Sequence, residues 1–171
     1  ESLESWVTAT QTHQANVIRH TIEILRTLKY RPVGGHCQFL LNDAMPFISH
    51  AVLDHKRRPK LGWQALAAAS RPVIIVADLR RPTIAAGVHR CAVHVISDLR
   101  EAIDGAMVDI TWRAPGIEPR TWQFGGRFDP DSVSRVARVK LTAPEPGPGS
   151  LTLSLTGPGI ECSNSYDITV V

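Results

Sequence analysis

Apolar and polar residues alternate in short stretches throughout the second part of the chain, from Pro72 onward. Successive side chains of a β-strand point to opposite faces, so alternation indicates strands with one buried face. Three sets of apolar residues at every second position show the pattern most clearly: Val108, Ile110 and Trp112; Leu151, Leu153 and Leu155; and Tyr166, Ile168 and Val170. This part of the chain therefore predicts a β-sheet domain.

Turn signals rich in glycine and proline separate these stretches, for example Pro115-Gly116 and Gly157-Pro158-Gly159. Strands are predicted near Val73–Leu79, Val88–Ser97, Ala106–Arg113, Arg120–Phe128, Val133–Thr142, Ser150–Thr156 and Tyr166–Val171. Short strands at this spacing are typical of an immunoglobulin-like antiparallel β-sandwich. The Cys…Trp…Cys pattern of antibody domains is absent, so the prediction concerns the architecture alone.

The first part of the chain has apolar residues at helical spacing instead. A helix is predicted from about Ser5 to Lys29, and Pro32 with Gly34-Gly35 ends it. Its buried stripe is formed by Ile18, Ile22 and Leu25 and widened by Val17, Ile24 and Leu28. A stripe of this kind marks the buried face of an amphipathic helix.

A strand and a second helix follow. The apolar run Phe39 to Leu41 stops at Asn42-Asp43, which predicts a strand from about His36 to Leu41 that is buried on both faces. The run Phe47 to Leu53 is apolar enough to be buried as well. Alanines then favour a short helix from about Leu61 to Ser70.

These elements predict an α+β chain with two domains, residues 1–71 and 72–171. One strand between two helices has no partner at either edge, and it leaves the helix stripes partly uncovered. We therefore expect a larger neighbour, either a missing N-terminal part of the same protein or a partner subunit. The sequence begins with Glu1 rather than Met, which is consistent with a longer natural chain.

Composition excludes several classes of function. Hydrophobic residues make up 43% and charged residues 20% of the chain, as in a folded globular protein. The net charge is +3, and the densest basic cluster, Lys56-Arg57-Arg58 with Lys60, has no aromatic stacking platform beside it. We expect a solvated loop there and no nucleic-acid partner. No apolar run is long enough to span a membrane, and no signal peptide is visible. The compartment stays open, with the cytoplasm slightly favoured.

The three cysteines, Cys37, Cys91 and Cys162, are too few and too widely spaced for a disulfide framework or a zinc site. The positions of Cys91 and Cys162 in two predicted strands allow one disulfide between them. His89 and His94 have opposite strand parity, so they do not face a common metal. No metal and no cofactor are predicted.

The segment after the predicted strand resembles a known family. The string Asn42-Asp43-x-x-Pro46-x-x-Ser49-x-x-x-x-Asp54, then Arg58-Pro59-Lys60 and the helix Gly62 to Ala69, resembles the end of the catalytic domain of glycoside hydrolase family two. The β-mannosidase branch is the most similar. The resemblance implies that residues 1–71 are a helix–strand–helix remnant of a (β/α)8 barrel. It also implies that the domain after it is the immunoglobulin-like domain that follows the barrel in this family.

The chain departs from the family at aromatic positions. Phe39 stands where the family has Trp at the strand end, and Leu40 stands for Gln. Met45 and His50 replace two further tryptophans. Aromatic faces stack on sugar rings in such sites, so these replacements weaken the expected sugar platform.

The resemblance also implies a retaining mechanism, which needs two carboxylates about 5–5.5 Å apart. It places both catalytic glutamates upstream of this chain, at the ends of earlier barrel strands. The glutamates present here match neither motif: Glu1, Glu4, Glu23, Glu101, Glu118, Glu145 and Glu161. No catalytic residue is therefore predicted in the chain.

The resemblance leaves substrate contacts as the role of the predicted strand end. The candidate sugar-binding residues are Asn42, Asp43, Phe39, Met45 and His50. For Asn42-Asp43, the alternative is a loop cap formed by local hydrogen bonds, and the residues alone do not decide between the two.

Structural roles are favoured over ligand contacts at four positions: Asp54, His50, Trp112 and Trp122. For Asp54 we favour a loop-fixing ion pair with Lys60 or Arg58, and for His50 a buried histidine with satisfied hydrogen bonds. Trp112 and Trp122 are interpreted as sandwich core or rim.

The leading functional hypothesis is the C-terminal portion of a retaining, β-mannosidase-like β-glycosidase acting on a carbohydrate substrate. The alternative is a non-catalytic module of immunoglobulin-like fold that binds carbohydrate or protein.

Overall fold

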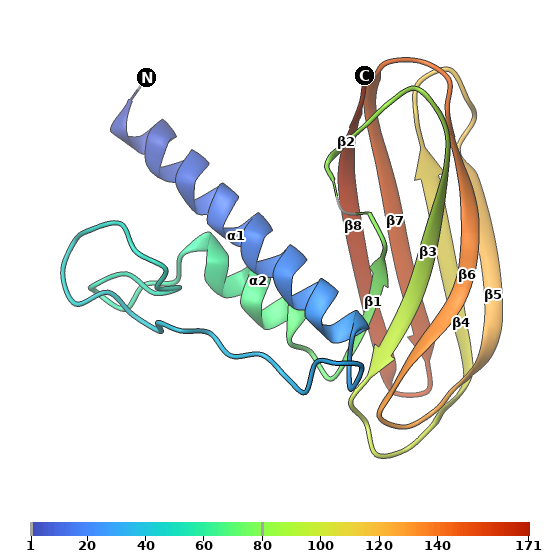
Figure 1. Cartoon of the computed structure of the whole chain (residues 1–171), viewed down its shortest axis with the longest axis horizontal. Coiled ribbons are helices and arrows are strands. Elements are labelled where there is room, and N and C mark those ends of the chain that lie inside the picture. Colours follow the sequence, from blue (N-terminus) through green and yellow to red (C-terminus); the bar gives the residue numbers. More distant parts are fainter. Residues whose placement is uncertain (1, 80) are drawn as a thin grey trace. The chain divides into compact units, whose positions relative to one another are not determined.

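A computed structural model describes residues 2–79 and 81–171 (Figure 1). The chain divides into two compact units, one up to Arg71 and one from Pro72 to Val171. The first unit holds the helices α1 (Leu3–Thr27) and α2 (Leu61–Ala69). The second holds the strands β1 (Val73–Ala77), β2 (Thr83–Ile84), β3 (Gly87–Ser97), β4 (Ile103–Arg113), β5 (Arg120–Phe128), β6 (Ser132–Ala143), β7 (Gly147–Gly157) and β8 (Ile160–Val170). The predicted α+β class is confirmed.

Helix α1 begins two residues earlier than the sequence predicted. The hydroxyl of Ser2 accepts a hydrogen bond from the Ser5 amide at 3.1 Å and so caps the first turn. Ile22 is buried as expected, but the residues predicted to widen the stripe, Val17, Ile24 and Leu28, are exposed. Within the described residues of this unit, α2 and the segment between the helices pack on α1 and leave these three side chains exposed.

A buried arginine joins the two helices. Arg26 of α1 is buried, and its Nη1 donates to the carbonyls of Ala69 and Arg71 at 2.7 Å each. These carbonyls lie at the carboxyl end of α2, where backbone acceptors lack partners inside the helix. The side chain of Arg26 therefore caps α2 from the neighbouring helix.

The strand predicted from His36 to Leu41 is wrong. This segment forms no strand, Phe39 is 85% exposed and Leu41 is 57% exposed. A strand buried on both faces needs neighbours on both edges and helices on both sides. The part of the chain that the structure describes supplies neither to this segment, so the apolar run stays on the surface. Of the run Phe47 to Leu53, only Ala51 and Val52 are fully buried.

The second unit is an antiparallel, sandwich-like pair of sheets. One sheet has the strand order β1-β3-β6 and the other the order β2-β8-β7-β4-β5 (Figure 1). All seven predicted strands are present. The short strand β2, which pairs in parallel with β8, was not predicted, because two residues are too few to show a period.

The residues predicted to share a face do form the core between the sheets. The three alternating sets on β4, β7 and β8 are all buried, and Trp112 donates its indole N–H to the carbonyl of Thr142 at 2.8 Å. Trp122 is half-buried and packs against this core, so the structural interpretation of both tryptophans is confirmed.

A polar link also joins the two sheets. The Ala77 amide donates to the hydroxyl of Tyr166 at 3.0 Å, and Asn164 donates to the same hydroxyl and to the carbonyl of Ile75. Strand β1 is thereby tied to β8 by hydrogen bonds between polar groups in and beside the core.

The disulfide that the sequence allowed is not formed. None of the three cysteines is in a disulfide; Cys91 and Cys162 are buried and Cys37 is exposed. Burial raises the pKa of the Cys91 thiol to about 12, so this thiol stays protonated. Both buried cysteines act as small core side chains.

Replacing Arg26 by Met tests the cross-helix cap. We expect Arg26→Met to lower the free energy of unfolding of the helical unit by about 2 kcal/mol, because two charge-assisted hydrogen bonds are lost. The exposed arginine variant Arg31→Met serves as the control and should leave it unchanged. Urea denaturation followed by helical circular dichroism measures both, and equal losses would contradict the capping role.

Candidate functional site

Except for Phe39, the candidate site residues lie between the two helices in the segment from Asn42 to Lys60. We call this segment the 42–60 loop. Isolated bridges join Asn42 to Leu53 and Leu53 to Pro59. The amide of Asp43 donates to the carbonyl of Leu53 at 3.1 Å, and the amide of Lys60 donates to the carbonyl of Val52 at 2.9 Å. The loop is therefore folded back on itself around the buried residues Ala51 and Val52.

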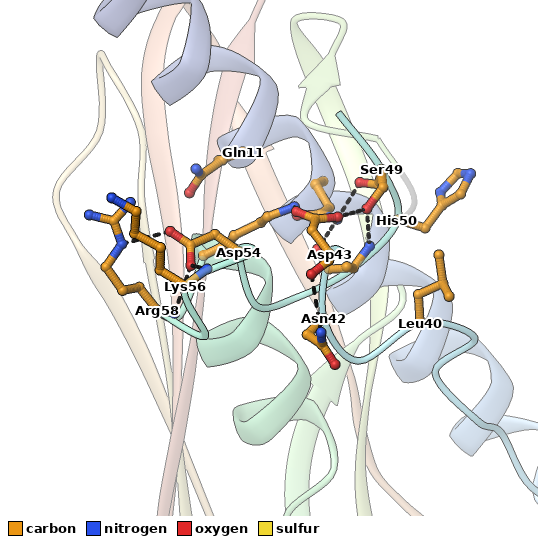
Figure 2. A network of polar contacts seen from close by, with 12 residues as sticks. Gln11, Leu40, Asn42, Asp43, Ser49, His50, Asp54, Lys56 and Arg58 are labelled. Carbon is orange, nitrogen blue, oxygen red and sulfur yellow. Dashed lines mark hydrogen bonds and ion pairs between the residues drawn. The ribbon is translucent and has the colours of Figure 1, made fainter. Parts of the chain in front are cut away.

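Asp43 is the polar centre of the 42–60 loop (Figure 2). It is only 4% exposed, and Lys60 Nζ lies 2.5 Å from its Oδ2. The hydroxyl of Ser49 donates to its Oδ1, and the same hydroxyl accepts the amide of Ala51 at 2.9 Å. Both carboxylate oxygens are thus engaged inside the loop.

The ionisation of Asp43 reflects two opposing effects. Burial by itself would raise the pKa of Asp43, but the hydrogen bonds from Lys60 and Ser49 outweigh it and hold the pKa below its usual value. Asp43 is therefore an anion near neutral pH. A buried anion with two internal partners is suited to fixing the loop, since it has no oxygen left without a partner.

Asp54 organises the other end of the loop. Its Oδ1 accepts the amides of Lys56 and Arg58 at 2.8 Å each, and its Oδ2 lies 2.6 Å from Arg58 Nε. The Arg58 amide is the main cause that holds the pKa of Asp54 below its usual value. The predicted loop-fixing pair is confirmed for Arg58, whereas Lys60 pairs with Asp43 instead.

Helix α1 holds the loop from the side. Gln14 Nε2 donates to the carbonyls of Ser49 at 3.3 Å and Ala51 at 3.1 Å. Gln11 Oε1 accepts the Leu61 amide at 3.2 Å, which caps the first turn of α2. Sequence reasoning missed both glutamines, because their partners lie 35 to 50 positions away and no local pattern marks them.

The other four candidate residues are exposed. Phe39, Asn42, Met45 and His50 all lie on the surface of the unit, and the amide side chain of Asn42 donates to the carbonyl of Asp43 at 3.1 Å. The prediction of a buried His50 is wrong: only its backbone carbonyl is held, by Gln38 Nε2 at 2.9 Å. No neighbouring element within the described part of this unit covers the imidazole.

Within residues 2–79 and 81–171, no group of three or more His, Cys, Asp or Glu side chains is arranged to hold a metal ion. None of the described helices combines the length and the apolar character needed to cross a membrane. The 42–60 loop has exposed apolar, amide and imidazole side chains, and hydrogen bonds and ion pairs within the unit hold its backbone.

Comparison with known proteins gives matches among solved structures alone. No family model and no curated protein match the chain. An exo-chitosanase from Amycolatopsis orientalis is similar over 99% of this chain, with a TM-score of 0.79 and 16% identity. A β-D-mannosidase from Dictyoglomus thermophilum is similar over 99%, with a TM-score of 0.75 and 16% identity. The chain spans 20% of the length of each of these proteins. At this identity the likeness shows a shared fold.

Replacing Asp43 tests whether its ion pair holds the loop. We expect Asp43→Asn to lower the free energy of unfolding of the helical unit by about 3 kcal/mol, because it leaves Lys60 buried without its anion. Asp54→Asn is the matched control and should cost less, since Asn can still accept the amides of Lys56 and Arg58. Urea unfolding at neutral pH measures both losses.

The same pair predicts a pH dependence. Because the pKa of Asp43 is lowered in the folded state from an ordinary value near 3.8, its contribution is complete above that value. It is lost as the pH falls through the lower, folded pKa. The difference in unfolding free energy between the wild-type chain and Asp43→Asn should therefore shrink in strong acid. A constant difference across the acid range would contradict this assignment.

Proposed function

We propose that the chain is the C-terminal portion of a retaining β-glycosidase of glycoside hydrolase family two, on the β-mannosidase branch. In this proposal residues 1–71 are the end of its catalytic barrel and residues 72–171 are the immunoglobulin-like domain that follows. The observation that carries the proposal is the fold match to two carbohydrate-cleaving enzymes. It includes 99% of this chain but only a fifth of theirs.

Exposed apolar residues support a missing neighbour. Phe39, Leu41, Met45, Phe47 and Ile48 are all more than half exposed, and they fall within ten positions of one another. Soluble proteins rarely leave such a concentration of large apolar side chains in water unless a partner covers it. In the proposal, the remaining strands and helices of the barrel cover these residues and pair the segment 36–41 as a strand.

The candidate sugar contacts then divide into two roles. Asn42, Phe39, Met45 and His50 are exposed and available to a carbohydrate at the mouth of the barrel. Asp43 has both oxygens engaged by Lys60 and Ser49, and its carbonyl holds the Asn42 side chain. We therefore assign Asp43 a positioning role beneath Asn42 within the proposed substrate site.

The catalytic step itself is assigned to the missing part of the enzyme. A retaining glycosidase uses one carboxylate as nucleophile and a second as acid and then base, about 5–5.5 Å apart. Of the glutamates in the helical unit, Glu4 is exposed near the start of α1, and Glu23 is buried with Arg19 Nε at 3.9 Å. We assign neither Glu4 nor Glu23 to the catalytic carboxylate pair.

The experiment compares the 171-residue chain with the product of the complete reading frame that encodes it. We expect the isolated chain to hydrolyse neither a chromogenic β-mannoside nor a chromogenic β-glucosaminide, because it lacks the carboxylate pair. The complete product should hydrolyse at least one of them. Asn42→Ala in that product should raise KM or lower kcat.

Two results would overturn the proposal. Hydrolysis by the isolated chain that a substitution within it abolishes would place the catalytic residues here. A complete product that binds sugar but cleaves none would favour the non-catalytic carbohydrate-binding module. Sugar binding is measured by calorimetry on both proteins.

The exposed apolar segment predicts the behaviour of the isolated chain. We expect it to self-associate, because Phe39 and Ile48 have no cover in the described structure. The double variant Phe39→Ser, Ile48→Ser should shift sedimentation toward the monomer. The control Val88→Ser, at an exposed apolar position of β3, should not. An unchanged distribution in the double variant would count against a missing barrel neighbour.

A further inference from the structure

Four cations gather on one face of the β-sheet unit. Arg90 on β3 and Arg135, Arg138 and Lys140 on β6 are all exposed. We call these four residues the basic ridge. Arg90 is the Cα partner of Lys140 across the two strands, and Arg138 and Arg135 follow along β6 as the partners of Ala92 and His94.

All four side chains belong to the outward face of the three-stranded sheet. The alternate residues, Cys91 and Val93 on β3 and Val139 and Leu141 on β6, are buried in the core between the sheets. Residues paired across antiparallel strands share a face, so the alternation places the basic ridge on the opposite side. A register shift after Val93 keeps Arg135 beside His94.

The basic ridge has no acidic partner among the described residues. The recorded ion pairs of the second unit join Arg127 to Asp104 and Asp129, and none includes a ridge residue. His94 adds no charge near neutral pH, because burial lowers its pKa. The nearby charge of Asp78 raises this pKa in part, and the charge of Arg135 lowers it further. Like charges directly opposite each other, as Arg90 and Lys140 are, destabilise a sheet.

Protection of the sheet edge accounts for only part of the ridge. Charged residues and bulges on an outer strand prevent unwanted pairing, which would explain Lys140 and the irregularity of β6. Arg90, however, lies on β3, the central strand of its sheet. Protection of the sheet edge therefore does not explain the repulsion between Arg90 and Lys140. An anion bound from outside the chain would relieve this repulsion.

Strand β6 also has a free edge. It is an outer strand in the order β1-β3-β6, so β3 pairs with one side of it and no described strand pairs with the other. An outer strand exposes backbone N–H and C=O groups that can pair with an added strand. The free edge and three of the four ridge cations, Arg135, Arg138 and Lys140, thus lie on the same strand.

We propose that the β6 edge and the basic ridge bind an extended acidic polypeptide segment that adds as a strand beside β6. Side chains on one face of a strand repeat about every 6.8 Å, so Asp or Glu at alternate positions would face Arg138 and Lys140. Backbone pairing supplies affinity in this mode, and the side chains supply selectivity. The proposal is independent of the glycosidase assignment.

Other polyanionic partners fit the surface less well. Neither β3 nor β6 carries a Phe, Tyr or Trp, so the ridge offers no aromatic platform for the bases of a single-stranded nucleic acid. It also lacks the amphipathic helix with which many proteins insert into an anionic membrane surface. An extended peptide alone uses both the free backbone edge and the alternating charge.

The test is fluorescence anisotropy of the full chain with a labelled peptide of alternating Thr and Glu. We expect Arg138→Glu and Lys140→Glu each to weaken binding at least about tenfold, or about 1.4 kcal/mol. The control Arg113→Glu, at an exposed cation of β4 on the other sheet, should leave binding unchanged. A peptide methylated on the backbone amides that would face β6 should also bind at least about tenfold more weakly.

A stability measurement separates binding from folding. Arg90→Ala removes the repulsion with Lys140, so it should keep or raise the melting temperature while it weakens peptide binding. Equal binding of the methylated peptide, or equally tight binding of heparin or polyphosphate, would overturn strand addition in favour of a general polyanion surface. No binding, or the same loss in Arg113→Glu, would also overturn the proposal.

Discussion

Backbone pairing decides which apolar stretches of this chain become strands. In the second unit every strand has a neighbour, and the alternating side chains then close a core between two sheets. The segment 36–41 ends in the apolar run Phe39 to Leu41, which is as apolar as many of those strands. It nevertheless forms no strand. Its N–H and C=O groups have no adjacent strand within the described chain. The need of a strand for a paired neighbour therefore accounts both for the formed strands of the second unit and for the exposed segment of the first.

The 42–60 loop keeps its shape without regular secondary structure. Asp43, Ser49 and Lys60 form a buried polar centre, Asp54 closes a tight turn, and Gln14 ties the loop to α1. Each of these groups is satisfied by others inside the unit. Such a network holds a backbone in one conformation, as a loop that presents ligand-contacting groups requires.

Two groups of cations in the chain differ in their partners. Lys60, Arg58 and Arg127 each have an acidic partner close by and contribute to local structure. The cations of the basic ridge have none among the described residues, and three of the four sit on a strand with a free edge. The ion-paired cations stabilise the folded chain, and the basic ridge is the surface at which we propose that an acidic partner binds.

The sequence by itself determined which faces of the strands are buried, because the period of two fixes the direction of each side chain along β4, β7 and β8. It also determined the helices to within about two residues, since their caps and breakers are local. Tertiary structure alone decided that Lys60 pairs with Asp43 rather than Asp54, that His50 is exposed, and that Arg26 caps α2. These outcomes depend on which distant backbone groups come into reach, and residue spacing along the chain carries no information about that.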